Sequence, residues 1–434
     1  MTHKNDKKSI FAWVMYDWAN SAFATSVLAG FFPIFFKQYW SVGIDPTLST
    51  ARLGLANAAA GLLVAILAPF LGAVADMGAF KKKFLLFFTV LGVVATAALY
   101  FVGLGDWAWA AFFFSCANVG FSGGIIFYDA LITDISSEDR LHNISALGYA
   151  YGYLGGGLLC AINVWMSLSP ATFGLSDTTE AVRMIFMTVA IWWAIFSIPL
   201  FVMVKEPVYI APKNKLNMIS GGVKQLWVTL HEIRHQKNLL LFLVAYWFYI
   251  DGVGTVIRMA VDYGMSLGFK PDDLIAALLI TQFIGLPAAI AFGHLGNRLG
   301  AKISIFIGLA IYLAVSIGGA FITSRVEFWI LATLIGLAQG GVQTLSRSYY
   351  AMIIPPEKSA EYFGFYNMLG KFAAVLGPVL MGSVPLLFRH FGYASDTASR
   401  AGIISISLLF LIGAILLYQV KEQKPSNQTA GINQ

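Results

Sequence analysis

Long apolar runs constrain this chain more than any other feature, because a run of about 20 apolar residues crosses a bilayer as a helix. We predict twelve such runs along the 434 residues, six on each side of one long polar segment. Their predicted bounds are 10–36, 51–75, 84–104, 107–133, 143–167, 184–204, 239–266, 273–295, 302–323, 327–353, 361–387 and 401–420. Only 12% of the residues are charged, against about 25% in an average soluble domain. We therefore expect an all-α integral membrane protein.

Lysine and arginine are unevenly distributed between the two sides of the predicted spans. Of the 28 Lys and Arg residues, three lie inside spans and seven on the side opposite the N-terminus, which leaves eighteen on the N-terminal side. Because positive residues accumulate in the cytoplasm, both termini are expected there. This bias accounts for the net charge of +6, and no basic stripe with interleaved aromatics occurs, so no nucleic-acid partner is expected.

The two sets of six spans repeat a common plan. GAVADMGAFKKK, which follows the second span, corresponds to GHLGNRLGAK, which follows the eighth. Glycine pairs in spans 4 and 10 align at an offset of 217 (positions 123–124 and 340–341), and Gly148 aligns with Gly364 at an offset of 216. A parallel repeat of six spans is the plan of the major facilitator transporters. The expected division is two pseudo-symmetric halves, 1–204 and 239–420, a cytoplasmic linker with an amphipathic helix, 205–238, and a flexible cytoplasmic tail, 421–434.

Charged residues inside the spans, away from their ends, are concentrated in spans 1, 4, 7, 10 and 11. A charge within a membrane is costly, so these residues are expected to face a central cavity. The candidates for substrate binding are Tyr16, Asp17, Asn20, Asp251, Gln343, Arg347, Tyr350 and Lys371. Three carboxylates, Asp17, Asp129 and Asp251, are candidates for carrying a coupling proton, because a carboxylate at such depth needs a proton or a partner. Asp129 also admits an ion pair with Arg140 or Arg347.

Carboxylates and cations occur together among these candidates. Such a set suits a zwitterion, whose carboxylate would meet Arg347 or Lys371 while its ammonium group meets Asp17 or Asp251. The repeated turns are expected instead to gate the conformational change. The gating candidates are Asp76, Lys81 and Lys82 in the first turn and Asn297, Arg298 and Lys302 in the second.

One motif suggests a different class of protein. Residues 231–235 read HEIRH, which matches the zinc-protease pattern of two histidines on one helical face with a glutamate between them. No third ligand is evident, and Leu226, Leu230 and Ile233, with Trp227, form an apolar stripe that explains the segment as an amphipathic helix on the membrane surface. We therefore expect no metal, no cofactor and no enzymatic activity. No G-x-x-x-x-G-K loop is present, so an ion gradient or the substrate's own gradient is expected to drive transport.

Three stretches carry a family resemblance: YDWANSAF (16–23), Asp251–Val253, and SRSYYAMIIPPEKSAEYFGFYNMLGKFAAVLGP (Ser346–Pro378). They resemble the autophagy-related vacuolar amino-acid effluxer family, whose bacterial branch is called an unknown major facilitator family. The resemblance covers essentially the whole chain. It implies the major facilitator fold, a bacterial inner membrane and, by analogy with the vacuolar members, export of amino acids. The chain departs from the family pattern at Asp129, where asparagine is usual, and near Thr133, where proline is usual; the first change adds a carboxylate near the cavity mouth.

We therefore expect a monomeric secondary transporter that exports a small polar or zwitterionic solute by alternating access, with protons as a second partner. Two alternatives stay open at this point. One is a carrier of an amphiphilic or cell-wall-derived solute, and the other is a membrane sensor that has the same fold but transports nothing.

Overall fold

The computed structural model describes residues 4–207, 218–266, 268–373 and 376–421, and this part of the chain contains helices and no strand. The helices before the linker are α1 (Lys7–Ala22) with its continuation η1 (Phe23–Phe31), α2 (Phe32–Phe35) and η2 (Phe36–Trp40), then α3 (Pro46–Gly78), α4 (Lys81–Ala98), η3 (Leu99–Phe101), α5 (Trp107–Ala130), α6 (Ile132–Ile135), η4 (Glu138–Arg140), α7 (Leu141–Leu168), η5 (Pro170–Phe173) and α8 (Thr178–Met203).

The remaining helices include one in the linker and the second set of long helices. They are α9 (Met218–His235), α10 (Lys237–Ser266), α11 (Pro271–Leu299), α12 (Ala301–Gly319), α13 (Arg325–Ile353), η7 (Pro356–Lys358), α14 (Ser359–Phe372), α15 (Leu376–His390) and α16 (Ser395–Gln419). The predicted eleventh span lies within one candidate membrane span, Pro356–His390, in which the described residues form two helices, α14 and α15.

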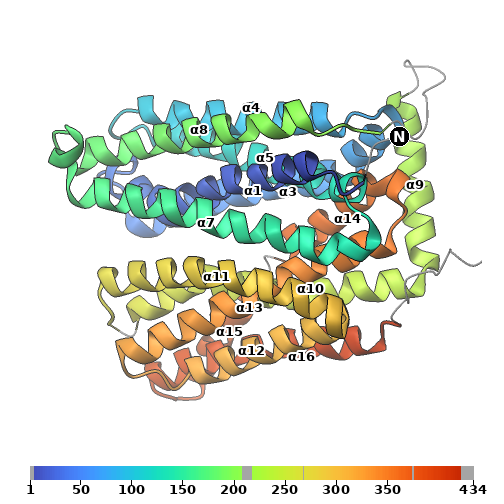
Figure 1. The fold of residues 1–434 in the computed structure, drawn as a ribbon. Helices are drawn as coiled ribbons and strands as arrows, with labels where there is room; N and C mark the ends of the chain where they lie inside the picture. The colour runs from blue at the N-terminus through green and yellow to red at the C-terminus, as the bar shows by residue number, and fades with distance from the viewer. Residues whose placement is uncertain (1–3, 208–217, 267, 374–375, 422–434) are drawn as a thin grey trace, which may run out of the picture.

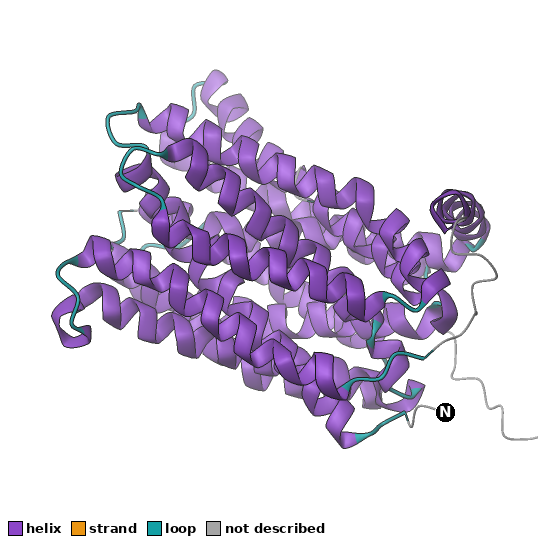
Figure 2. Ribbon diagram, turned by 90° about the horizontal axis from the view of Figure 1, so that it is seen from above, coloured by secondary structure: helices purple, strands orange, loops and turns teal. Residues whose placement is uncertain are grey.

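The long helices run side by side in two groups, as Figure 1 shows. Helices α1 to α8, blue to green, form the upper group, and α10 to α16, yellow to red, form the lower one. Helix α9 crosses the end of the bundle at which the N-terminus lies, and in Figure 2 it is seen end-on beyond the ends of the long helices. We call this the N-terminal end of the bundle.

Among the described residues, eleven helical segments are long and apolar enough to cross a membrane. The predicted span 143–167 corresponds to α7, which is 28 residues long but is not one of the eleven. Its sequence contains several glycines and tyrosines and Asn163 among its apolar residues. The total of twelve spans and the cytoplasmic position of both termini thus stay predictions.

Local sequence signals explain where several long helices begin. The Asp6 side chain accepts a hydrogen bond from the Ser9 backbone N–H at the start of α1, and Asp177 does the same for Glu180 at the start of α8. Ser324 and Glu327 form a reciprocal capping box before α13. Each arrangement satisfies backbone N–H groups that a helix start leaves without partners. Beyond α1, the chain continues as a π-helix through Phe23–Phe31.

Parts of two predicted segments lie outside the described residues. These parts are residues 208–217 of the linker and residues 422–434 of the tail. The part of the linker that is described contains α9, in which Thr229 and Ile233 are buried and Trp227 is exposed.

The two groups of helices approach closely at the N-terminal end. A Cβ atom added to Gly72 of α3 would lie 2.3 Å from the carbonyl oxygen of Ala360 in α14. One added to Gly364 of α14 would lie 2.6 Å from the carbonyl oxygen of Ala68 in α3. Glycine is therefore required at both positions, because any side chain would separate the two backbones. Between described residues, the hydrogen bonds that join the two groups all lie from this end to the middle of the helices. The bundle is closed at its N-terminal end.

We expect Gly72→Ala to destabilise this closed arrangement by about 1–3 kcal/mol, the usual cost of overpacking a tight contact. Gly61→Ala is the matched control on the same helix, since nothing lies within 4 Å of its added Cβ. The control should be neutral or slightly stabilising, because alanine favours a helix over glycine. Thermal unfolding of the purified variants measures the difference. Equal melting temperatures for the two variants would contradict the close approach of α3 and α14.

Candidate functional site

A cavity of about 340 Å³ lies between the two groups of helices, near their middle. Both groups contribute to its wall, with α1, α5 and α7 on one side and α10, α11, α13 and α14 on the other. Its polar and charged lining consists of Asp17, Asn20, Ser21, Thr25, Tyr128, Asp129, Tyr149, Tyr153, Tyr246, Gln282, Gln339, Gln343, Arg347, Tyr366, Asn367 and Lys371. Five of the predicted substrate-binding residues therefore share this cavity: Asp17, Asn20, Gln343, Arg347 and Lys371.

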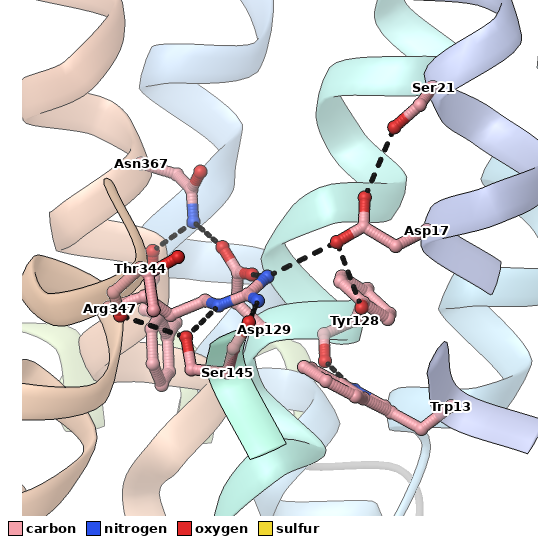
Figure 3. Close-up of polar contacts among 10 residues, drawn as sticks. Trp13, Asp17, Ser21, Tyr128, Asp129, Ser145, Thr344, Arg347 and Asn367 are labelled. Atoms are coloured by element: carbon pink, nitrogen blue, oxygen red, sulfur yellow. Dashed lines mark hydrogen bonds and ion pairs between the residues drawn. The ribbon is translucent and has the colours of Figure 1, made fainter. Parts of the chain in front are cut away.

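Arg347 of α13 lies at the junction of the two groups and is almost fully buried. Its Nη1 atom is 3.1 Å from Oδ1 of Asp129 and 3.7 Å from Oδ2 of Asp17. Its Nε donates to the Ser145 hydroxyl at 3.0 Å, and its Nη2 to the Ser145 carbonyl at 2.8 Å. One guanidinium group thus uses its fixed fork of donors on three helices of the other group (Figure 3).

The two carboxylates around Arg347 have further partners. Tyr128 donates its hydroxyl to Oδ2 of Asp17 at 3.2 Å, and Ser21 donates to Oδ1 at 3.3 Å. The Asn367 amide donates to Oδ2 of Asp129 at 3.4 Å, as Figure 3 shows. Asp129 therefore pairs with Arg347, the second of its two expected partners, while Arg140 is exposed elsewhere.

Aromatic rings surround the Arg347 guanidinium. Its central carbon lies 4.1 Å from the ring centroid of Tyr149, 5.0 Å from that of Trp13 and 5.6 Å from that of Tyr128. The Trp13 and Tyr128 rings stack, with centroids 4.5 Å apart. These faces stabilise the cation and exclude water from it, which strengthens its attraction to the two carboxylates.

Lys371 is in a different situation from Arg347. It lies on α14, one helical turn beyond Asn367, and its Nζ donates to the Ser122 hydroxyl at 2.6 Å. None of the ion pairs between described residues includes Lys371. The cavity therefore contains one cation held by carboxylates and another that contacts only a neutral hydroxyl.

Three predicted substrate-binding residues lie outside the cavity lining. Asp251 of α10 is completely buried, and its carboxylate accepts backbone N–H bonds from Leu376 at 2.8 Å and Gly377 at 3.2 Å. It thus caps α15, where the eleventh span is interrupted. Tyr16 bonds to Thr89, and Tyr350 donates to the carbonyl of Tyr362, each within its own group of helices.

The first predicted gating turn joins the two groups of helices. Asp76 accepts hydrogen bonds from the backbone N–H groups of Ala360 and Glu361 at 3.2 and 2.8 Å, in the first turn of α14. The Nζ atom of Lys81 lies 3.0 Å from Oδ2 of Asp134 and 3.6 Å from Oδ1 of Asp76, and it donates to the Ser359 hydroxyl at 2.7 Å. A carboxylate at a helix N-terminus is favourable for both hydrogen bonding and the helix dipole.

The predicted gating residues of the second turn make no hydrogen bond to the other group among the described residues. Lys302 donates to the carbonyls of Tyr418 and Val420 at the end of α16, while Asn297 and Arg298 are exposed. Lys82 of the first turn makes the equivalent contact with the end of α8, donating to the carbonyl of Val204. The two lysines are therefore pseudo-symmetric caps of helix C-termini. Charged side chains of the first turn also bridge the groups, whereas the second motif approaches α7 through Gly293 and Gly296.

The HEIRH motif lies on α9, and its glutamate, Glu232, forms an ion pair outside the motif. Glu232 pairs with Lys358 at 2.7 Å, and the Nδ1 atom of His235 contacts the backbone carbonyl of His231. Among the described residues, no group of three or more His, Cys, Asp or Glu side chains is placed to hold a metal ion.

Sequence reasoning missed several residues of the site. Ser145, Tyr149 and Tyr128 contact Arg347 or its partners, but they are ordinary residues of apolar spans. Tyr128 precedes Asp129 directly, which was the available signal. Ser145 contributes a backbone carbonyl as well as its hydroxyl, and a backbone contact between helices leaves no trace in a single sequence.

Solved structures with the same fold define the class of this protein. The chain superposes on the transporter FucP, a major facilitator protein in the outward conformation, with a TM-score of 0.72, 13% identity, and coverage of 96% of this chain and 99% of that one. It superposes on the human organic anion transporter MFSD10 with a TM-score of 0.68, 16% identity, and coverage of 94% and 98%. With eleven long apolar helical segments among the described residues and a cavity between two groups of helices, it is an integral membrane protein with the major facilitator fold.

The family within that class follows from sequence comparison. Residues 48–430 match the family described as vacuole effluxer Atg22 like, and the chain belongs to this family. An uncharacterized MFS-type transporter of Bacillus subtilis, YxiO, is 37% identical over 415 residues, covering 95% of this chain and 94% of that protein. Autophagy-related protein 22 of Yarrowia lipolytica is 29% identical over 270 residues, covering 56% of this chain and 45% of that protein.

We expect Arg347→Ala to destabilise the protein by about 3–5 kcal/mol, because it leaves two buried carboxylates without their cation. The double variant Arg347→Ala/Asp129→Asn should recover part of that loss, since one of the uncompensated charges is then absent. Denaturation of the purified proteins measures both values. A double variant no more stable than Arg347→Ala alone would show that the pair does not contribute as the distances indicate.

Proposed function

We propose that this protein is a secondary active transporter of a small zwitterionic solute and works by alternating access. The charge distribution in the central cavity carries the proposal. Asp17 and Asp129 together have two negative charges against the single positive charge of Arg347, while Lys371 has no carboxylate partner among the described residues. The cavity therefore has a surplus negative charge at one place and a free positive charge at another.

A zwitterion matches both charges at once. Its carboxylate would displace the Ser122 hydroxyl from Lys371 and accept a charge-assisted hydrogen bond there. Its ammonium group would meet Asp17, which is farther from Arg347 than Asp129 is. Arg347 itself is occupied by Asp129 and Ser145, so we assign it to holding the carboxylates in position and not to binding the solute.

The closed N-terminal end corresponds to one state of the proposed transport cycle. The Asp76 carboxylate, the Lys81–Ser359 bond and the Ser145–Thr344 bond join the two groups there. All three would have to break for the cavity to open toward that end. We propose that this end is cytoplasmic and that transport proceeds as export, in line with the vacuole effluxer description of the family.

We also propose that Asp17 carries the coupling proton. It lines the cavity, bonds only to neutral hydroxyl groups within 3.5 Å and lies at the longer distance from Arg347. Asp251, the other deep candidate, is occupied by the backbone of α15 and does not line the cavity. Protonation of Asp17 would weaken its hold on an ammonium group, which is how a proton gradient would release the solute.

In proteoliposomes screened with amino acids, we expect Lys371→Gln to reduce the affinity for the accepted solute about 10- to 100-fold, because a charged hydrogen bond contributes about 1.5–3 kcal/mol. Asp17→Asn should bind the solute more weakly, because the ammonium group loses its charged partner, and the exchange that remains should no longer accelerate under an imposed proton gradient. Tracer flux measures both.

Lys37→Gln is the control, since that lysine is exposed at the opposite end of the bundle. Unchanged affinity in Lys371→Gln would refute the zwitterion site, and a full gradient response in Asp17→Asn would refute the proton assignment.

A second cavity favours a second candidate function, transport of an amphiphilic solute. This cavity measures about 240 Å³ and is lined mainly by apolar side chains of α10 to α13, α15 and α16. It shares Ala24, Thr25, Gln282 and Gln339 with the central cavity, so the two are adjacent. A solute with a polar head and an apolar tail would occupy both.

Ala332→Phe places a ring in the wall of this apolar cavity without touching the central one. If the solute is amphiphilic, we expect this variant to lose most of its transport, because the tail no longer has space. If the solute is a small zwitterion, transport should stay within about twofold of the wild-type rate, since the substitution removes no polar contact. Competition assays with short and long apolar analogues distinguish the two candidates.

A further inference from the structure

Helix α9 occupies a defined position between the membrane and the closed end of the bundle. It is followed after a single residue, Gln236, by α10, whose apolar span begins at Lys237. The Gln236 N–H donates to the Glu232 carbonyl, so the chain turns directly from α9 into the span. Helix α9 therefore lies at the level where the bilayer ends, across the N-terminal end of the bundle (Figure 1).

One face of α9 touches both groups of long helices. A Cβ atom added to Gly222 would lie 2.8 Å from Val74 of α3, which means that the α9 backbone packs directly on that helix. On the other side, Glu232 pairs with Lys358 at 2.7 Å and accepts a bond from the Tyr362 hydroxyl at 3.4 Å.

The same face reaches the first turn of α14. Gln225 donates to Oε2 of Glu361 at 3.5 Å, and the Glu361 N–H is one of the two that Asp76 accepts. Helix α9 thus holds the two sides of the closed end together from outside.

The opposite face of α9 is exposed and has a mixed apolar and basic character. Trp227 is 69% exposed and Leu230 is 44% exposed, and both lie on one flank with Arg234. Lys224 and His235 are exposed on the neighbouring flank. Glu232 is the only acidic residue between Met218 and His235, and it is already paired with Lys358.

We propose that α9 is an interfacial latch, whose exposed face binds the anionic headgroups of the bilayer while its inner face holds the N-terminal end closed. A tryptophan and a leucine beside arginine and lysine are the side chains that seat a helix in the headgroup region. The basic residues match an anionic leaflet, where each contributes about fivefold to binding. A soluble acidic partner would not need the exposed indole at the level of the bilayer edge.

The latch couples lipid charge to the transport cycle. Opening the N-terminal end moves α14 away from α3, and this breaks the contact of Glu232 with Lys358 or lifts α9 from Val74. When α9 is bound to anionic lipid, its position is fixed and the closed state is favoured. The inference concerns conformation and does not depend on the identity of the solute.

Hydrogen exchange of the full-length protein in nanodiscs, one copy per disc, tests the latch. We compare discs of neutral phosphatidylcholine with discs that also contain phosphatidylglycerol. Anionic lipid should slow exchange in residues 218–235 and in residues 359–365 at the start of α14. In Lys224→Gln/Arg234→Gln the lipid effect should shrink at least about fivefold in both segments.

Two further variants separate binding from coupling. Glu232→Gln should keep the lipid effect in residues 218–235 but lose it in residues 359–365, because the inner contact is weakened. Lys83→Gln removes an exposed positive charge from the same end and should change neither segment. Equal exchange in the two lipid compositions would overturn the proposal. Equal losses of the lipid effect in Lys83→Gln and in Lys224→Gln/Arg234→Gln would also overturn it. So would protection that is absent from discs with one copy and appears only in comparison discs that contain two copies.

Discussion

The ion cluster around Arg347 is the interaction on which the rest of the structure depends. Burying one guanidinium and two carboxylates within a membrane is costly unless each charge finds its partners, and here the partners come from both halves of the bundle. Helices α1, α5 and α7 must therefore present Asp17, Asp129 and Ser145 to α13 at the same depth. This requirement sets the register between the halves in the closed arrangement and explains why polar residues interrupt otherwise apolar helices.

Much of this arrangement could be predicted from the sequence, because its cause is visible there. Lipid tolerates only long apolar helices, so the runs of apolar residues predict the spans, and charges that lipid cannot tolerate predict a cavity. Asp17, Arg347 and Lys371 line that cavity for this reason. The glycines repeated in the two halves likewise indicate a duplicated fold and mark helices that approach closely, as Gly364 does on α3.

Other features could not be predicted, because their cause lies in the backbone. Asp251 is a buried carboxylate like Asp17, yet it caps α15. Gly377 and Pro378 mark a break at the start of α15, but they do not identify the group that caps this helix. Ser145 holds Arg347 partly through its carbonyl, which every residue possesses. Residues of one type thus have different roles, and only the path of the neighbouring chain separates them. The two similar turns show the same point, since Asp76 reaches across the halves while Asn297 faces solvent.

The asymmetry between those turns has an evolutionary consequence. Several contacts of the closed end, those of Asp76 and Lys81, lie on the first turn of α14, apart from Lys371 and the cavity lining. In the proposed transport cycle, substitutions at Asp76 or Ser359 would therefore change the relative stability of the two end states and leave the proposed solute-binding residues unchanged. Turnover and selectivity can then vary independently among descendants of one ancestor. A family built on this plan can adapt its working rate to a new membrane before, or without, changing what it carries.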